Sequence, residues 1–309
     1  MNPKELDNLL SSKKLSYDKK IADFQFERNQ SRYVLIINDQ KRKYIFKGLI
    51  NQNDQDRNSF IKDIHFIKNL SNLSAPFKTN TIIDSGDKPS LWIILDYIEG
   101  QVSGNIFEYN KSFINNNFLA SIFSSIEWLQ KNPPKNVLKD NKTFSLWLEK
   151  NAKKIIDHDY FKINLNSIKR VINYLQKYSL DKKNIFFAHN DLSPLNVIIR
   201  NKEISIIDWE MSGFNIAPFD LAYCFQRAWR YPIFQKMILE KISVKKEVSF
   251  KKAFMGLILI FLCIDLITFQ KALNGFKFKH GQEFSQDYLQ ELENIYQEKI
   301  SFVIEEFNK

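Results

Sequence analysis

Two short apolar runs in the middle of the chain, residues 185–188 and 204–207, border a cluster of polar residues. The segment reads FFAHNDLSPLNVIIRNKEISIIDWE over residues 186–210. Buried strands normally keep charged groups away from their ends, yet Asp191 follows the first run and Asp208 ends the second. The fold of this chain must therefore place carboxylates at the ends of two buried strands.

The strands NVIIR and EISIID, which begin at Asn196 and end at Asp208, predict a β-hairpin that turns at residues 201–202. Such a hairpin places Asn196 and Asp208 at the same end of two paired strands. One amide and one carboxylate are oxygen ligands that suit Mg²⁺, which takes its other ligands from water and substrate phosphates. Asp191 would then accept a proton from a hydroxyl group, which is a phosphoryl-transfer arrangement. The alternative is a loop in which these residues only cap turns.

Length and composition indicate a folded protein with a large core. The chain has 309 residues, of which 44% are hydrophobic, including 27 Phe and 12 Tyr. That is enough for one large domain or two lobes. The formal charge is +10 and the pI is about 9.3, which allows attraction to phosphates or an anionic membrane. No run of five or six basic residues marks a nucleic-acid tail, so we expect a solvated lysine-rich surface and no nucleic-acid partner.

Cysteine usage and hydropathy indicate a cytoplasmic protein. Cys224 and Cys263 are isolated, which fits a reducing compartment. The opening MNPKELDNLL lacks the plan of a signal peptide. The apolar segment 253–269 is interrupted by Asp265, and its uninterrupted part is shorter than the roughly 20 residues that a membrane span requires. We therefore expect a buried helix and no transmembrane segment; the oligomeric state stays open.

Periodicity divides the chain into a β-rich part and a helical part. A helix is predicted over 57–70, and further helices over 111–131, 143–157, 165–179 and from about 217 to the end. Strands are predicted over 21–28, 31–38, 42–50, 80–86 and 90–100. This pattern predicts an α+β protein with a small β-rich amino-terminal lobe, residues 1–99, and a larger helical carboxy-terminal lobe, residues 100–309.

The motif His189-x-Asp191-x-x-x-x-Asn196, followed by IDWE at 207–210, resembles the catalytic and metal-binding motifs of the choline kinase and aminoglycoside phosphotransferase family. The segment GFNIAPFDLAYCF, residues 213–225, continues the match. The resemblance implies a two-lobed protein-kinase-like fold and an ATP-dependent transfer of the γ-phosphoryl group to an alcohol, with Mg²⁺. Carried over to this chain, Asp191 resembles the catalytic base, Asn196 and Asp208 the magnesium ligands, and Glu210 an acidic residue near the metal.

Two further residues of the motif resemble structural positions of the family. Asp220 matches a buried aspartate that accepts hydrogen bonds from the backbone of the catalytic loop. We expect His189 to order that loop and not to react.

The amino-terminal half resembles the same family at Lys47, in YIFKG at the end of a strand. The resemblance implies that this lysine holds the α- and β-phosphates. Its usual partner is a glutamate on a helix, and Asp63 is the matching carboxylate here. Because Asp is one methylene shorter, we expect a long or water-bridged Lys47–Asp63 pair. The segment IILDYIEG resembles the hinge between lobes, where the backbone at Asp96 and Ile98 would bind adenine; a plain edge strand is the alternative.

One departure from the family lies in the turn ERNQSRY, residues 27–33, which contains no glycine. Family members often use glycine there, because it lets the backbone approach phosphate closely. The side chains of Asn29 and Ser31 would supply hydrogen bonds instead. A nucleotide other than ATP stays open for this reason.

The acceptor site is predicted from the segment after the motif. In choline kinases an acidic residue helps to hold the quaternary ammonium, and its place falls near Gln226-Arg227. We assign Arg227 and Trp229 to the acceptor site, with Trp229 and Tyr231 as parts of an aromatic cage for a cationic group. Arg227 would oppose a cationic acceptor such as choline or bind an acidic one; the alternative is that it only pairs with a surface carboxylate. Arg230 adds a second positive charge, which acidic residues between 283 and 298 would offset.

Choline or a related amino alcohol is the leading acceptor on resemblance. A sugar, thiamine, an aminoglycoside or an anionic metabolite is the alternative within the same reaction. A protein kinase is disfavoured, because Trp-Glu follows Asp208 where protein kinases have Phe-Gly, and eleven residues separate Asp208 from Asp220. A non-catalytic kinase-like binding protein is the second rival, favoured by the glycine-free turn.

Overall fold

The structure is a computed structural model that describes residues 1–27, 30–51, 53–70, 73–134, 139–140, 142–245, 247–274 and 284–308. The chain separates into two compact units, Met1–Ser103 with Leu195–Ser212, and Gly104–Pro194 with Gly213–Lys309. The first division lies close to the boundary predicted near residue 99. The segment 195–212 differs from the prediction, because it groups with the first unit and not with the helical one.

Packing around Trp209 explains why this segment joins the first unit. Its fully buried ring stacks against Phe66 and Phe77, with centroids 6.3 and 5.7 Å away. Its indole N–H donates to the hydroxyl of Thr79 at 2.8 Å. The backbone of Lys78 also exchanges hydrogen bonds with β9 (Glu203–Ile206), from Lys78 N to Ile204 O at 3.1 Å and from Ile206 N to Lys78 O at 2.8 Å. These contacts join residues far apart in the sequence, so periodicity does not reveal them.

An antiparallel sheet with the strand order β1-β2-β3-β5-β4 forms the centre of the first unit. Side chains alternate along β2, where Tyr33, Leu35 and Ile37 are buried. They pack with the apolar face of α1, whose amino terminus has a capping box formed by Asn2 and Glu5. The strands are β1 (Ser16–Tyr17), β2 (Arg32–Asn38), β3 (Lys43–Leu49), β4 (Ile82–Gly86) and β5 (Trp92–Asp96), and the first helix is α1 (Pro3–Ser12).

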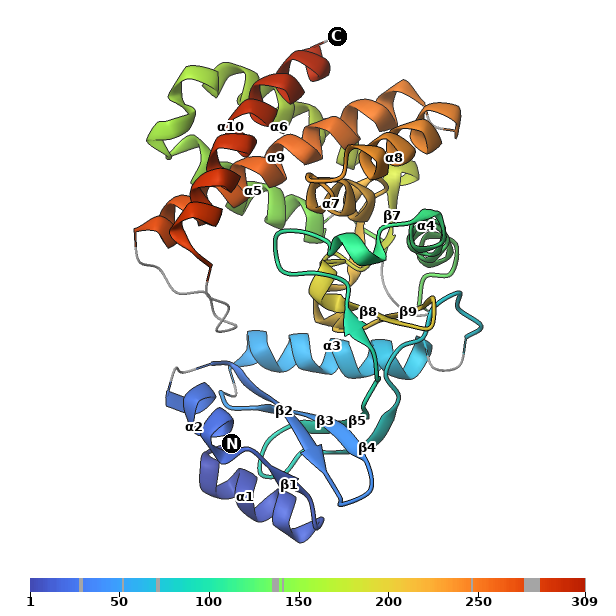
Figure 1. The fold of residues 1–309 in the computed structure, drawn as a ribbon, viewed down its shortest axis with the longest axis vertical. Coiled ribbons are helices and arrows are strands. Elements are labelled where there is room, and N and C mark those ends of the chain that lie inside the picture. Colours follow the sequence, from blue (N-terminus) through green and yellow to red (C-terminus); the bar gives the residue numbers. More distant parts are fainter. Residues whose placement is uncertain are drawn as a thin grey trace. The chain divides into compact units, whose positions relative to one another are not determined.

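The opposite face of this sheet carries Lys47 and is covered in part by α3 (Asp54–Leu70), whereas α1 lies on the first face (Figure 1). The register places Val34 opposite Lys47 and Ile36 opposite Ile45, so these side chains share one face. Val34 and Ile36 are 45% and 53% exposed. The first unit therefore presents an apolar surface beside a buried lysine.

A second sheet in the first unit contains β6 (Gln101–Val102), β8 (Val197–Arg200) and β9 in the order β6-β8-β9. The β8–β9 hairpin turns at Asn201 and Lys202, which have φ values of 51° and 70°. Two consecutive positive φ values are the signature of a type I′ turn, the turn that matches strand twist. The hairpin predicted from the sequence is confirmed.

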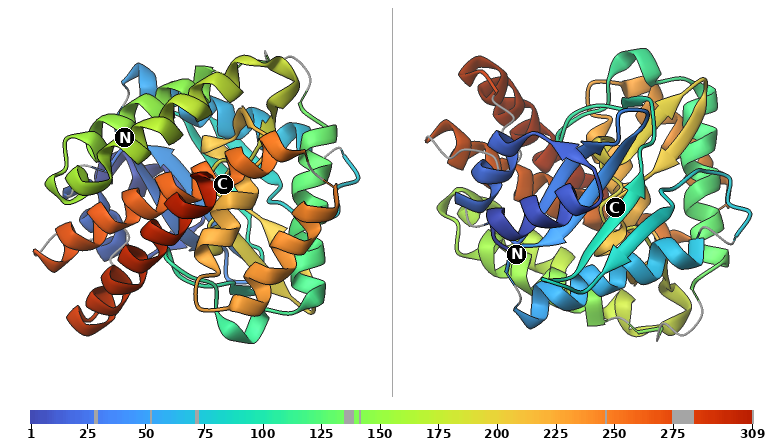
Figure 2. Two further views of the ribbon diagram at one scale, coloured as in Figure 1. Left: turned by 90° about the horizontal axis from the view of Figure 1, so that it is seen from above. Right: turned by 90° about the horizontal axis from the view of Figure 1, so that it is seen from below.

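The second unit is mainly helical, with one small antiparallel sheet that pairs β7 (Ile185–Ala188) with β10 (Gly213–Ile216). The helices predicted over 111–131, 143–157 and 165–179 are present with shifted ends. Helix α10 runs alongside α9 (Figure 2). The helices are α4 (Asn116–Lys131), α5 (Lys142–Ile156), α6 (Leu165–Leu180), α7 (Phe219–Arg227), α8 (Pro232–Lys245), α9 (Val248–Leu273) and α10 (Gln286–Asn308). Short 3-10 helices are η1 (Lys111–Phe113), η2 (Asp159–Asn164), η3 (Lys182–Asn184), η4 (Pro194–Asn196) and η5 (Trp209–Met211).

Helix α9 is long and apolar enough to cross a membrane by length and composition alone. Within the protein, 78% of its most apolar window is buried. Leu257, Leu259 and Leu266 are fully buried along it. The prediction of a buried helix for segment 253–269 is confirmed.

The strand predicted over residues 21–28 is wrong, because this segment forms helix α2 (Lys19–Glu27). The alternation of Phe24 and Phe26 favoured a strand. In the structure, the side-chain amide of Gln25 donates to Val34 O and accepts from Val34 N, both at 3.1 Å. One side chain thus takes the edge hydrogen bonds that a strand would have taken. Asn29, predicted to contact phosphate, lies outside the described residues.

Candidate active site

Lys47 lies in β3 with its ammonium group between two carboxylates of the first unit. Nζ donates to Asp63 Oδ2 at 2.9 Å and to Asp208 Oδ1 at 2.8 Å. Lys47 is 7% exposed and Asp63 is fully buried on α3. The expectation of a long or water-bridged pair is wrong, because α3 packs against β3 and places both side chains in one buried layer.

The charge of Lys47 is set by these neighbours. Burial alone would lower the pKa of Lys47, but the carboxylates of Asp63 and Asp208 outweigh it and raise the pKa above its ordinary value. The side chain is therefore a fixed ammonium ion. Two carboxylates against one ammonium leave a local excess of negative charge, which is the setting in which a divalent cation binds well.

Asn196 and Asp208 flank the β8–β9 hairpin, as predicted. Asn196 ends η4 and is 8% exposed. Its backbone carbonyl accepts from Ile207 N–H at 3.0 Å, which ties the two strand ends together. Asp208 has left-handed backbone angles, φ 65° and ψ 69°. Asp tolerates this region better than most residues, and such conformations cluster at functional sites.

The donor chemistry of this hairpin end fits a magnesium ion. Among the described residues, no group of three or more His, Cys, Asp or Glu side chains is arranged to hold a metal. Asn196 and Asp208 supply only an amide and a carboxylate. A hard cation held there would take its remaining ligands from water and phosphate oxygens, as Mg²⁺ commonly does.

Glu210, the third predicted metal residue, lies in η5 and forms a salt bridge with Arg32 at the start of β2. Burial and then the charge of Asp208 raise the pKa of Glu210, while Arg32 and Lys47 act in the opposite direction. Arg32 was not predicted from the sequence. A single arginine before an apolar strand gives no signal, because only the fold brings Glu210 to it.

The predicted hinge residues follow β5. Asp96 is tied to the neighbouring chain, because its carboxylate accepts from Thr81 N at 2.5 Å and its backbone N–H donates to Thr81 O at 3.0 Å. Its carbonyl also accepts from the side chain of Asn80 at 2.9 Å. Ile98 lies two residues further in irregular, half-buried backbone. In the described chain its N–H and C=O make no hydrogen bond, so Ile98 offers backbone groups to a ligand more directly than Asp96 does.

Asp191 belongs to the second unit, in the loop after β7. The backbone of this loop is held by Asp220 on α7, whose carboxylate accepts from His189 N at 2.8 Å and from Asn190 N at 2.9 Å. Asn190 has φ 67°, and its side chain accepts from Asn215 Nδ2 at 2.7 Å. The backbone-holding role predicted for Asp220 is confirmed. Burial raises the pKa of Asp220 to about 6, and the two N–H donors act in the opposite direction.

His189 is fully buried and contacts the loop that it was predicted to order. Its Nδ1 accepts from the backbone N–H of Asp191 at 3.3 Å. This contact fits an ordering role, because an Nδ1 that accepts a hydrogen bond requires the neutral ring with its proton on Nε2.

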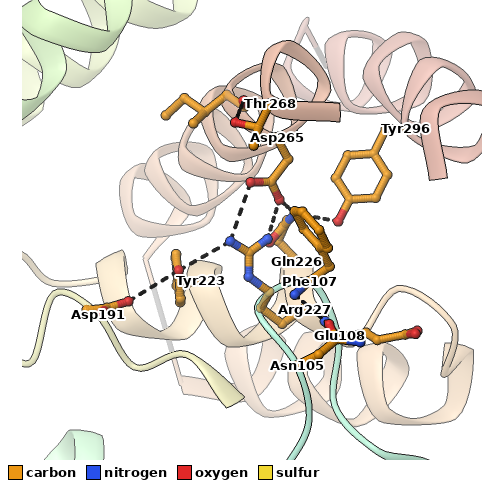
Figure 3. A network of polar contacts seen from close by, with 11 residues as sticks. Asn105, Phe107, Glu108, Asp191, Tyr223, Gln226, Arg227, Asp265, Thr268 and Tyr296 are labelled. Carbon is orange, nitrogen blue, oxygen red and sulfur yellow. Dashed lines mark hydrogen bonds and ion pairs between the residues drawn. The ribbon is translucent and has the colours of Figure 1, made fainter. Parts of the chain in front are cut away.

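Asp191 is contacted by Tyr223, which the sequence did not single out. The Tyr223 hydroxyl donates to Asp191 Oδ1 at 3.3 Å (Figure 3). Arg227, one turn further along α7, donates from Nη2 to the Tyr223 hydroxyl at 3.2 Å and forms an ion pair with Asp265 on α9. The structure thus places Arg227, predicted to face the acceptor, in a buried charge pair with only 6% of its surface exposed.

Trp229 is also buried, at 6% exposure, and its ring already faces cations. The guanidinium of Arg230 lies 4.2 Å from the ring centroid and the ammonium of Lys299 lies 5.8 Å away. Arg230 is in turn paired with Glu108 and Glu291, each at 2.8 Å. An external cation would therefore compete with Arg230 for this indole.

Comparison with known proteins agrees with the resemblance found in the motifs. Residues 116–255 match the choline/ethanolamine kinase family. Choline kinase B1 of Caenorhabditis elegans is 35% identical over 65 residues, 20% of this chain and 18% of that protein. Probable choline kinase 1 of Arabidopsis thaliana is 35% identical over 113 residues, 35% of this chain and 32% of that protein. The matched segments thus span about a fifth and a third of these relatives.

Solved structures resemble the chain over most of its length. A GDP complex of wild-type aminoglycoside 2'-phosphotransferase-IIIa has a TM-score of 0.55 at 12% identity, covering 88% of this chain and 89% of that one. The ADP-bound aminoglycoside phosphotransferase APH(2'')-Ib has a TM-score of 0.53 at 15% identity, covering 96% and 97%. Macrolide 2'-phosphotransferase MphH of Brachybacterium faecium has a TM-score of 0.56 at 9% identity, covering 86% and 93%. The predicted protein-kinase-like fold is confirmed, and so is the resemblance to the choline kinase and aminoglycoside phosphotransferase family.

Proposed function

From the likeness of this chain to choline kinases and aminoglycoside phosphotransferases, we propose that it is an ATP-dependent kinase of small molecules. It would transfer the γ-phosphoryl group to the hydroxyl of an alcohol acceptor. The observation that carries the proposal is Lys47, a buried ammonium held between Asp63 and Asp208. Kinase-like enzymes use such a lysine on the α/β-phosphates and such an aspartate on the metal.

Nucleotide binding is assigned to the first unit. The exposed Val34 and Ile36 share the sheet face of Lys47, which offers an apolar surface to a purine ring. The backbone of Ile98, and of Asp96 to a lesser extent, would bind the adenine edge. Asn196, Asp208 and Glu210 would hold Mg²⁺, which when bound would neutralise charge on the phosphates.

The chemical step is assigned to Asp191 in the second unit. Its carboxylate would accept the proton of the acceptor hydroxyl as the oxygen bonds to the γ-phosphorus and the bond to the nucleoside diphosphate breaks. The hydrogen bonds that Asp220 accepts from the loop backbone support this role. They hold the backbone just before Asp191 and so restrict where the Asp191 side chain points. Positioning is the main contribution a protein makes to this reaction.

The acceptor that we favour is choline or a related amino alcohol. The family match over residues 116–255 supports it. The positive charge of Arg227 does not by itself disfavour a cationic acceptor such as choline, because the ion pair with Asp265 neutralises Arg227 inside the protein. A sugar, thiamine or an aminoglycoside is the second candidate, favoured by the aminoglycoside phosphotransferases among the similar structures.

The test is nucleotide consumption by the purified protein with Mg²⁺ and either ATP or GTP. The acceptor panel contains choline, ethanolamine, sugars, thiamine and aminoglycosides. We expect turnover with one acceptor class, lowered about a hundredfold or more in Asp191→Asn while nucleotide binding persists. Nucleotide binding without turnover on any acceptor would favour a non-catalytic binding protein. Near-normal turnover in Asp191→Asn would contradict its role as base.

A further inference from the structure

We propose that Tyr223 is a positioning residue for Asp191, and that the buried Arg227–Asp265 pair fixes the direction of the Tyr223 hydroxyl. The inference rests on the proposed function, in which Asp191 is the base. All four residues lie in the second unit, on the loop after β7, on α7 and on α9 (Figure 3). Tyr223 and Arg227 are four residues apart on α7 and so share one face of that helix.

The direction of the hydrogen bonds follows from the donor inventory. A guanidinium only donates, so the Tyr223 oxygen accepts from Arg227 Nη2 at 3.2 Å. The hydroxyl hydrogen is then available for a second partner, and Asp191 Oδ1 lies 3.3 Å away. The Arg227 contact thus selects the hydroxyl orientation that donates to the carboxylate. An O–H···O distance of 3.3 Å is longer than the usual 2.7–2.8 Å, and catalytic hydrogen bonds commonly shorten once substrate binds.

Arg227 is itself held from several sides. Its guanidinium contacts the carboxylate of Asp265 and donates to Gln226 Oε1 at 2.6 Å. Gln226 Nε2 bonds the Tyr296 hydroxyl at 2.7 Å, which adds α10 to the network. The Arg227 guanidinium also lies 4.7 Å from the centroid of the Tyr223 ring. These contacts hold the Arg227 guanidinium in place beside the Tyr223 hydroxyl, to which it donates.

A stability role alone does not account for this network. Replacing a buried ion pair by apolar residues of similar size is often neutral or stabilising, because both charges lose their hydration. The pair joins α7 to α9, and most buried residues of α9 are apolar, so Leu or Met would be compatible with these surroundings. Orientation of a base needs polar contacts, since a bond to Oδ1 directs Oδ2 towards the hydroxyl that is to lose its proton.

The first test is Tyr223→Phe, which removes the hydroxyl and keeps the ring. We expect kcat to fall about tenfold while the KM for nucleotide and the melting temperature stay unchanged. Tyr174→Phe is the matched control, because its hydroxyl donates to Ser249 O at 2.9 Å in the same unit, on another helix. The control should keep its kcat. An unchanged kcat in Tyr223→Phe would overturn the inference.

A double-mutant cycle separates positioning from general damage. If Tyr223 acts through Asp191, adding Tyr223→Phe to Asp191→Asn should cause no further loss of kcat. An equal loss in both backgrounds would show that Tyr223 acts elsewhere and would overturn the inference. A wild-type protein that is inactive on every acceptor would overturn the proposed function, and with it any base for Tyr223 to position. If the wild type is active and Tyr223→Phe keeps its kcat, the inference is overturned while the proposed function stands.

The role of the ion pair is tested with both charges removed together. Arg227→Met combined with Asp265→Leu leaves no unpaired buried charge, so the double variant should fold. We expect it to lose kcat to the same extent as Tyr223→Phe, and to lose nothing more when Tyr223→Phe is added. A melting temperature and kcat like those of the wild type would show that the pair does not position Tyr223.

Discussion

Lys47 contacts two carboxylates in a buried layer of the first unit, so its replacement should affect both stability and nucleotide binding. Lys47→Met keeps an unbranched side chain that is one atom shorter but leaves Asp63 without its cation. Breaking a buried pair in this way costs about 3–5 kcal/mol of unfolding free energy. We also expect a KM for nucleotide raised at least about tenfold. Urea unfolding and nucleotide titration measure the two effects.

The matched control for Lys47→Met is Lys78→Met in the same unit. Lys78 pairs with Glu203, but the two side chains are 69% and 63% exposed. An exposed pair contributes about 0–1 kcal/mol, so this variant should resemble the wild type in both measurements. Equal behaviour of the two variants would mean that the Lys47 contacts carry neither stability nor phosphate binding.

Asp208 and Asn196 should differ in their effect on magnesium dependence. The carboxylate carries a charge and the amide does not, and a hard cation is held more strongly by a charged oxygen. Asp208→Ala should therefore lower activity more than Asn196→Ala, and both should raise the magnesium concentration that half-maximal turnover requires. Magnesium titration of each variant checks this. Curves identical to that of the wild type in both would rule out the assigned metal site.

Helix α7 supports the loop that carries Asp191 through the carboxylate of Asp220, and the contribution of this carboxyl group to stability should depend on pH. Burial raises the folded-state pKa of Asp220 to about 6, above the ordinary 3.8. Ionisation of Asp220 therefore costs the folded protein free energy. The stabilisation that its protonated form contributes is fully present below about pH 4 and is lost as the pH rises through about 6. The difference of about two units corresponds to about 3 kcal/mol.

The comparison of wild type with Asp220→Asn isolates this titration. The unfolding free energy of the wild type relative to the variant should increase as the pH falls from about 7.5 to about 4. Asp181→Asn is the control of opposite sign, because the backbone N–H of Lys183 lowers the pKa of Asp181. There the wild type should keep its relative stability down to about pH 4 and lose it only on further acidification. A pH-independent difference for Asp220→Asn would contradict a raised pKa.

At the scale of the whole molecule, the proposed function predicts coupling between ligand binding and unfolding. A nucleotide that binds only the folded protein adds about 2.7 kcal/mol of stability at about 100 times its Kd. We expect ATP with Mg²⁺ to raise the melting temperature, and ATP with a chelator to raise it less. Thermal scans of tryptophan fluorescence would report on both units, because Trp92 and Trp209 lie in the first unit and Trp128, Trp147 and Trp229 in the second. No shift with any nucleotide would contradict nucleotide binding.

The net charge of +10 also acts on the whole molecule. A positive protein attracts anionic nucleotides over distances comparable to the Debye length, about 8 Å at physiological salt. This electrostatic attraction is non-specific and is screened by salt. It therefore helps association without selecting the acceptor.

Local sequence information determined the parts of the site that are close in the chain. The hairpin between Asn196 and Asp208 follows from alternating apolar residues and a turn whose two central residues take positive φ. The link from Asp220 to the loop that carries Asp191, and the pairing of Lys47 with Asp63, were predicted instead from the resemblance of the motifs to a known family, because these residues lie 16 to 31 positions apart. Apolar periodicity also located α4, α5 and α6, because a helix buries one face every 3.6 residues.

Tertiary structure alone decided the partners of those polar groups that the motifs do not cover. Gln25 hydrogen-bonds the backbone of Val34 in β2 from helix α2, in a segment predicted as a strand because Phe24 and Phe26 alternate as strand residues do. Arg227 pairs with Asp265, 38 residues away, because α7 packs against α9. A guanidinium taken out of water must find a carboxylate nearby, and the packing of helices determines which carboxylate that is. Spacing along the chain predicts local elements, whereas the partner of a buried charge depends on contacts that form only when those elements pack.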